Sequence, residues 1–260
     1  MNRVMSYLQH FFTAKRKGHD VHSPFVYQLC EEVFYNENGF YDFGMLKEMR
    51  ERLLKDNTTL KVNDFGAGSK SIHSDQRKVK DILRKGNSTQ LQAELLYKLI
   101  NYLKPSQVIE LGTSIGMTTL YLCSADPTKK VYSLEGSSAL LNFAKELLAD
   151  HYIKNCELIE GNFDSTFPNL LERIPEGGLI YFDGNHTYEA TLRYFNEALK
   201  KKNAHSVFIF DDIYWSEGMQ KAWSEIKGHA SVKVSIDTWY FGMVFFKEEI
   251  KEKIDLKLFI

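Results

Sequence analysis

The stretch Gln107–Glu135, QVIELGTSIGMTTLYLCSADPTKKVYSLE, decides the fold. Residues 108–111 form a short, mostly apolar run of the kind that suits a buried parallel strand. Residues 112–116 form a glycine turn, residues 117–123 suit a helix, and residues 131–134 begin a second strand that ends in an acid. A strand, a glycine-rich turn, a helix and a second strand ending in an acid about 20 residues later is the plan of a nucleotide-binding βαβ unit.

The acid before the turn narrows the class of ligand. Glycines let a backbone approach a ligand closely, and a helix N-terminus offers unpaired N–H groups with a partial positive charge. Glu110 lies just before the glycines, where its carboxylate would repel a pyrophosphate. A cationic nucleoside is tolerated there, and S-adenosylmethionine carries a sulfonium and an α-amino group but no phosphate. Glu135 ends the second strand and can accept two hydrogen bonds from the hydroxyls of a ribose.

The same residues carry a family resemblance. Residues 108–116, VIELGTSIG, resemble motif I of class I S-adenosylmethionine-dependent methyltransferases, in particular the small-molecule O-methyltransferases similar to catechol O-methyltransferase. The resemblance extends over roughly residues 89–246. It implies transfer of a methyl group from S-adenosylmethionine to a small-molecule acceptor, at a hydroxyl oxygen, assisted in the catechol-type enzymes by a divalent cation such as Mg²⁺.

Composition and length exclude several other classes of protein. The chain has 260 residues with 43% hydrophobic and 26% charged residues, which is typical of a globular domain with an extension. Its net charge of -1 implies no general attraction to nucleic acid or to an anionic membrane, and no apolar run approaches the length of a membrane span. Three scattered cysteines fit a reducing compartment, so we expect a cytoplasmic protein without disulfides.

Strands and helices alternate through the rest of the chain. Further strands are predicted at residues 157–160, 179–182 and 207–210, and a late pair at 232–236 and 241–246 has too short a connection for a crossover helix. We therefore predict an α/β fold with a doubly wound, Rossmann-like sheet closed by an antiparallel pair. The resemblance implies seven strands, the last of them antiparallel.

The predicted domains are an N-terminal, mostly helical extension or lid over residues 1–87 and a methyltransferase domain over residues 88–260. The extension lies largely outside the resemblance and contains several aromatic residues. We expect it to shape the acceptor pocket or a homodimer contact.

Polar residues follow one predicted strand after another. Because ligands bind beyond the carboxyl ends of the strands in an open α/β sheet, these residues should collect on one rim. By the resemblance, Glu110, Gly112 and Ser114 hold the methionine part of the cofactor, Glu135 holds the ribose hydroxyls, and Asn162 and Phe163 flank the adenine. The full set of predicted cofactor-binding residues is Glu110, Gly112, Thr113, Ser114, Gly116, Glu135, Asn162, Phe163 and Asp183.

The acids that follow two further predicted strands are candidates for a catalytic or metal-binding role. Asp183, Asp211 and Asp212 match positions that bind a divalent cation in the catechol-type enzymes, although Asp212 replaces the asparagine of that family. Three carboxylates could hold Mg²⁺, Mn²⁺ or Ca²⁺, and the alternative is a set of strand-end caps and cofactor contacts without metal. His186 is predicted to be the general base beside Asp183, since a histidine titrates near neutral pH. A metal ligand or a structural histidine remain the alternatives for His186.

Other functions compete with methyl transfer. Residues 112–116 also match G-x-S-x-G, the nucleophile elbow of α/β-hydrolases, with Ser114 as nucleophile. That elbow would sit on the first strand of the sheet and leave the acidic rim without a role. A nicotinamide-dependent dehydrogenase lacks its G-x-G-x-x-G pattern here, and a non-catalytic cofactor-binding module is a third alternative. A second glycine-rich stretch, residues 63–71, has no apolar helix after it, so we expect a turn or a lid there.

Overall fold

The computed structural model describes residues 3–15, 23–62, 76–86 and 88–260, and the turn or lid expected at residues 63–71 lies outside them. The chain forms two compact units. Unit 1 comprises residues 1–37 and 174–260, and unit 2 comprises residues 38–173. These units do not follow the division by sequence at residues 87 and 88, which stays a prediction.

Unit 2 contains the stretch that decides the fold. Three parallel strands pair in the order β3-β4-β5, with Gln107 opposite Lys130 and Val131 opposite Cys156. Two short strands form a separate antiparallel pair. The elements of unit 2 are α3 (Phe43–Leu53), β1 (Thr59–Lys61), β2 (Gln76–Lys78), α4 (Val79–Gly86), α5 (Gln90–Leu103), β3 (Gln107–Leu111), α6 (Met117–Ala125), β4 (Lys130–Glu135), α7 (Ser138–Asp150), β5 (Cys156–Glu160) and α8 (Phe163–Arg173).

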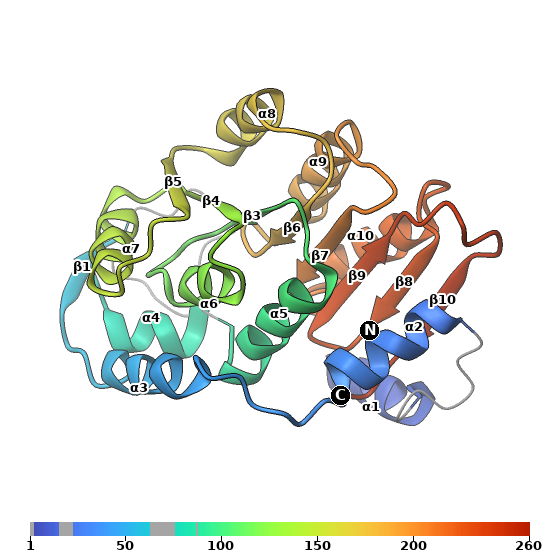
Figure 1. Ribbon diagram of the computed structural model, residues 1–260, viewed down its shortest axis with the longest axis horizontal. Coiled ribbons are helices and arrows are strands. Elements are labelled where there is room, and N and C mark those ends of the chain that lie inside the picture. Colours follow the sequence, from blue (N-terminus) through green and yellow to red (C-terminus); the bar gives the residue numbers. More distant parts are fainter. Residues whose placement is uncertain (1–2, 16–22, 63–75, 87) are drawn as a thin grey trace. The chain divides into compact units, whose positions relative to one another are not determined.

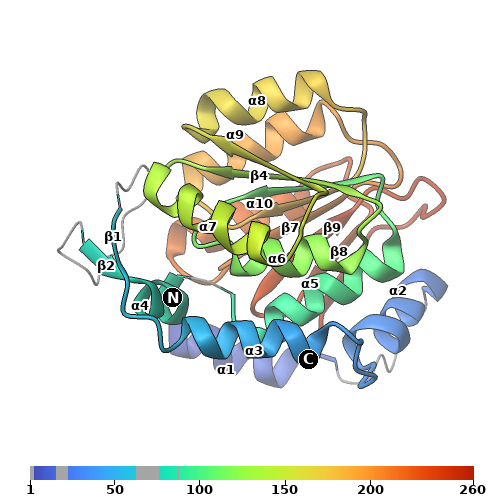
Figure 2. The ribbon, with the colours of Figure 1, turned by 60° about the vertical axis from the view of Figure 1, so that its left-hand side comes forward.

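Burial explains why the predicted βαβ unit forms. Every residue of β3 is buried, and in α6 every residue except Ser124 is buried. A helix that is apolar all round needs neighbours on several sides, and α6 contacts both α5 and β4. Helices α6 and α7 lie on one face of these strands and α8 on the other (Figure 2). The predicted strand, turn, helix and strand are therefore confirmed.

Unit 1 contains the remaining strands, paired in the order β6-β7-β9-β8-β10. Strands β6 and β7 are parallel, β9 is antiparallel to both β7 and β8, and β10 is parallel to β8. The elements of unit 1 are α1 (Arg3–Thr13), α2 (Pro24–Leu29), the π-helical turn η1 (Cys30–Phe34), β6 (Leu179–Phe182), α9 (Tyr188–Leu199), β7 (Val207–Asp211), α10 (Glu217–Gly228), β8 (Val234–Asp237), β9 (Phe241–Phe245) and β10 (Ile254–Lys257).

The first two helices belong to unit 1, where they pack near β8, β9 and β10 (Figure 1). The ring of Phe25 on α2 lies edge-on to Phe245 on β9, with 5.1 Å between the centroids. The segment after α1 forms backbone hydrogen bonds with the C-terminal strand, from Lys15 N–H to the carbonyl of Lys257 (2.9 Å) and from Phe259 N–H to the carbonyl of Lys15 (3.0 Å). The residue that follows α1 by two positions is thus hydrogen-bonded to the last residues of the chain.

The predicted fold class is confirmed: the described residues form an α/β protein with mostly parallel strands, Rossmann-like connections and a late antiparallel strand. Seven of the eight strands in these two sets were predicted, and β10 is the additional one. It lies beyond residue 246, where the resemblance ends. None of the helices in the described residues has the length and hydropathy needed to cross a bilayer.

Candidate functional site

The glycine turn after β3 requires its glycines. Gly112 and Gly116 have φ values of 113° and 82°, a region that side chains with a Cβ rarely adopt. A Cβ on Gly116 would lie 2.8 Å from Cβ of Ala144 on α7. Gly116 is also the N-cap of α6, and no side chain of the described residues caps this helix. The turn therefore brings a tightly packed backbone to a helix N-terminus whose N–H groups can bind a ligand carboxylate.

Glu135 holds the turn in place. Its Oε2 accepts a hydrogen bond from the backbone N–H of Ser114 at 2.8 Å, and its Oε1 accepts one from Ser137 N–H at 2.9 Å. Ser114 adopts a φ of 51°, which turns its N–H toward the carboxylate. The Glu135 side chain is half-buried. Its two hydrogen bonds fix it at the end of β4, and part of it stays accessible to solvent.

The end of β5 joins the same rim. Gly161 N–H donates to the backbone carbonyl of Glu135 at 2.9 Å, which ties the two strand ends together. Asn162 is exposed, and its side-chain Oδ1 accepts the N–H of Asp164 at 2.8 Å. Phe163 is half-buried at the start of α8. The structure thus brings the predicted methionine, ribose and adenine residues to neighbouring strand ends of unit 2, while their contacts with a cofactor stay predictions.

Glu110 is the penultimate residue of β3, close to the start of the glycine turn. Its side chain is fully buried, and Oε2 accepts hydrogen bonds from the hydroxyls of Thr119 (2.6 Å) and Ser133 (2.5 Å). The Ser133 hydroxyl also lies 2.6 Å from that of Thr113. Oε1 has no hydrogen-bond partner among the described residues. Burial raises the pKa of Glu110 to about 7, with a smaller contribution from Glu135 and an opposing one from the two hydroxyls.

A second group of predicted residues lies in unit 1. His186 Nε2 lies 3.6 Å from Oδ1 of Asp183, which is the distance of an ion pair and too long for a hydrogen bond. Asp211 is buried at the end of β7, where Oδ2 accepts the hydroxyl of Tyr181 (2.8 Å) and Oδ1 accepts the N–H of Asp212 (2.8 Å). Burial, then the neighbouring carboxylates of Asp183 and Asp212, hold the pKa of Asp211 well above its usual range.

These carboxylates do not fit a cation site as they are arranged. Across the described ranges of the chain, no group of three or more His, Cys, Asp or Glu side chains has the geometry to hold a metal ion. The predicted divalent cation therefore has no support here, and we derive no step through it.

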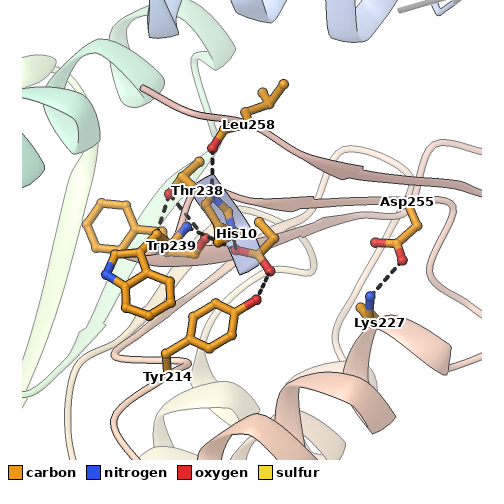
Figure 3. A network of polar contacts seen from close by, with 9 residues as sticks. His10, Tyr214, Lys227, Thr238, Trp239, Asp255 and Leu258 are labelled. Atoms are coloured by element: carbon orange, nitrogen blue, oxygen red, sulfur yellow. Dashed lines mark hydrogen bonds and ion pairs between the residues drawn. The ribbon is translucent and has the colours of Figure 1, made fainter. Parts of the chain in front are cut away.

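Sequence reasoning missed a buried polar network in unit 1 (Figure 3). Asp237, at the end of β8, accepts the hydroxyl of Tyr214 at 2.5 Å and the N–H of Trp239 at 2.9 Å. The ring of Tyr214 stacks on Trp239, with 4.4 Å between centroids. His10 on α1 donates from Nε2 to the carbonyl of Leu258 (3.1 Å). Its Nδ1 lies 3.3 Å from Asp237, close enough for an ion pair but at an angle that makes no hydrogen bond.

No sequence signal pointed to this network, because His10 is more than 200 residues away from the other members in the sequence and none of them belongs to a motif. Burial raises the pKa of Tyr214, and the Asp237 carboxylate raises it further, so Tyr214 stays a hydrogen-bond donor at neutral pH. The network connects the N-terminal helix to the loop that follows Asp211 and Asp212.

Comparison with known proteins agrees with this arrangement. Residues 109–213, which begin within β3 and end just after β7, match a family model described as a methyltransferase domain. This part of the chain is therefore similar to methyltransferase domains. The match covers the glycine turn, Glu135 and the strand ends that carry Asp183, Asp211 and Asp212.

Solved methyltransferases share the fold of the chain. The O-methyltransferase TomG from Streptomyces achromogenes, in complex with S-adenosylmethionine, is 15% identical with a TM-score of 0.57 over 85% of this chain and 95% of that one. An O-methyltransferase from Bacillus cereus in complex with S-adenosylhomocysteine is 14% identical, with a TM-score of 0.56 over 85% and 96%. The S-adenosylhomocysteine-bound methyltransferase PaMTH1 from Podospora anserina is 15% identical, with a TM-score of 0.55 over 63% and 81%. At these identities the likeness shows the fold alone.

A relative by sequence is the uncharacterized protein y4gI of Sinorhizobium fredii, which is 25% identical over 175 residues. The match covers 59% of this chain and 18% of the relative, so the chain matches about a fifth of the length of that protein.

Proposed function

We propose that the protein transfers a methyl group from S-adenosylmethionine to a hydroxyl oxygen of a small-molecule acceptor. The observation that carries the proposal is the arrangement in unit 2, where Glu135 fixes the glycine turn through Ser114 N–H at the N-terminus of α6. The match of residues 109–213 to a methyltransferase domain supports it. So do the solved methyltransferases of the same fold, which were crystallised with S-adenosylmethionine or S-adenosylhomocysteine.

The residues of unit 2 fit such a cofactor. The backbone of residues 112–116 and the N–H groups at the start of α6 can bind the methionine part, with Thr113 and Ser114 in this turn. Glu135 can accept hydrogen bonds from the ribose hydroxyls, and Asn162 and Phe163 can flank the adenine. The buried Oε1 of Glu110, which has no partner among the described residues, supplies negative charge for a cationic ligand. When bound, S-adenosylmethionine supplies a methyl group already activated by its sulfonium.

The residues of unit 1 supply the base in this proposal. The Asp183 carboxylate, 3.6 Å from Nε2 of His186, favours the tautomer that carries its proton on Nε2. The lone pair of Nδ1 then takes the proton of the acceptor hydroxyl, and Asp183 stabilises the imidazolium that forms. Contacts between catalytic groups are often long in ligand-free proteins and shorten to hydrogen bonds when the substrate binds. We also propose Asp183 as a cofactor contact, in keeping with the resemblance.

Two measurements test the proposal in sequence. Calorimetric titration with S-adenosylhomocysteine should show one binding site in the wild-type protein and weaker binding in Glu135→Ala. Transfer of a radiolabelled methyl group from S-adenosylmethionine to a panel of hydroxylated small molecules should then identify an acceptor. Absence of binding at millimolar S-adenosylhomocysteine would refute the cofactor assignment. Turnover that is unchanged in His186→Ala would refute only the assignment of the base.

A further inference from the structure

The surroundings of Glu110 raise a question about its charge. The side chain is 0% exposed at the end of β3, opposite Ser133 on β4. Two hydroxyl donors share Oε2, while the equally buried Oε1 has no donor among the described residues. A carboxylate needs hydrogen-bond donors on both oxygens or a cation to be stable away from water. Among the described residues, this site provides donors to Oε2 but none to Oε1.

The titratable groups that act on Glu110 also disfavour its ionised form. They are the carboxyl group of Glu135 at the end of β4 and the thiol of Cys123 on α6, both of which repel a negative charge when ionised. No lysine, arginine or histidine among the described residues forms an ion pair with Glu110, and the groups that contact it from α6 and β4 are the hydroxyls of Thr119 and Ser133. The one compensating charge that the proposed function brings to this place is the cationic ligand itself.

We infer that Glu110 is a protonated acid in a large part of the ligand-free protein and gives up this proton to solvent when the cationic cofactor binds at the glycine turn. The inference rests on the proposed function. In this step the neutral carboxyl group of Glu110 loses its proton to the solvent. The carboxylate that forms then pairs with the positive charge of the cofactor. Glu110 would thus couple cofactor affinity to pH, which is a regulatory property of the site itself.

The direction of the coupling follows from the protonation equilibrium. Burial places the pKa of Glu110 at about 7 in the free protein, against an ordinary value of 4.5. Below about pH 7, each unit of acidification should weaken cofactor binding by up to about tenfold, because the proton competes with the cation for Glu110. Without ligand, Glu110 contributes stability at acid pH that is lost as the pH rises from about 4.5 to about 7.

Calorimetry can count the proton directly. S-adenosylmethionine, which carries the sulfonium, is titrated into the protein without an acceptor at pH 6.5 in phosphate and in Bis-Tris, two buffers that differ in ionisation enthalpy. The dependence of the binding heat on the buffer should correspond to the release of roughly 0.5–1 proton in the wild-type protein. Glu110→Gln, which keeps the shape of the side chain, should release none. The matched control Glu172→Gln changes an exposed carboxylate on α8 and should behave as the wild type.

Each outcome decides the inference. Binding with the same heat in both buffers, or proton release that persists in Glu110→Gln, would overturn it while leaving the proposed function intact. Absence of binding in the wild-type protein would overturn both. If Glu110→Gln binds too weakly to be titrated, urea unfolding without ligand serves instead. The stability of the wild type relative to Glu110→Gln should fall between pH 4.5 and 7, and a difference that stays constant with pH would overturn the inference.

Discussion

Replacement of Gly116 by alanine tests the geometry of the glycine turn. The backbone φ of +82° is unfavourable for a residue with a Cβ and costs about 1–2 kcal/mol for alanine. The new methyl group would lie 2.8 Å from Cβ and 3.0 Å from Cα of Ala144 on α7, so the helix must shift. Overpacking of this kind costs about 1–3 kcal/mol. The free energy of unfolding should therefore fall by about 2–5 kcal/mol, a large part of the stability of an ordinary domain.

Urea denaturation followed by circular dichroism measures this loss, and a matched control is available in the same unit. Gly44 lies in α3 with an ordinary helical backbone, and a Cβ added there would meet nothing within 4 Å, so Gly44→Ala should leave stability unchanged or raise it by at most about 1 kcal/mol. In the Gly116→Ala background, Ala144→Gly should recover the part of the loss that is due to the contact. A Gly116→Ala protein within about 0.5 kcal/mol of the wild type would refute the reasoning.

Three further substitutions test separate contacts. Glu135→Ala removes the carboxylate that accepts the N–H of Ser114, so the free energy of unfolding measured by urea denaturation should fall by about 1–3 kcal/mol. Calorimetry should also show at least roughly tenfold weaker binding of S-adenosylhomocysteine. Wild-type affinity would contradict the role of Glu135. Tyr214→Phe removes the 2.5 Å donor of buried Asp237 and should lower the free energy of unfolding by about 1–3 kcal/mol, whereas an unchanged urea midpoint would show that the network contributes nothing. His186→Ala should lower methyl transfer by about 10²–10⁴-fold with unchanged S-adenosylhomocysteine affinity, and His186→Ala turnover equal to the wild type would exclude it as the base.

The sequence predicts those elements whose signal lies in a short run of consecutive residues. All residues of β3 and β7 are buried, and strands of this kind appear in the sequence as nearly continuous apolar runs. The glycines of the turn were predictable because their backbone conformation excludes other residues. The short connection between β8 and β9 likewise predicted an antiparallel pair.

The contacts that depend on distant residues were not predictable. Nothing in the motif around Glu110 indicates that Thr119 and Ser133 bind its carboxylate inside the protein. The family resemblance suggested a metal ligand at Asp211, but its burial against Tyr181 emerges only once β6 and β7 are paired. Strand β10 alternates apolar and polar residues over four positions, which is too short a pattern to predict a strand by itself.

The most direct test of the central claim is a crystal structure of the protein with bound S-adenosylhomocysteine. The methionine part of the ligand should lie against the backbone of residues 112–116 at the start of α6, and its ribose hydroxyls should be within hydrogen-bond distance of Glu135. A ligand found elsewhere, with the glycine turn and Glu135 left uncovered, would contradict the account.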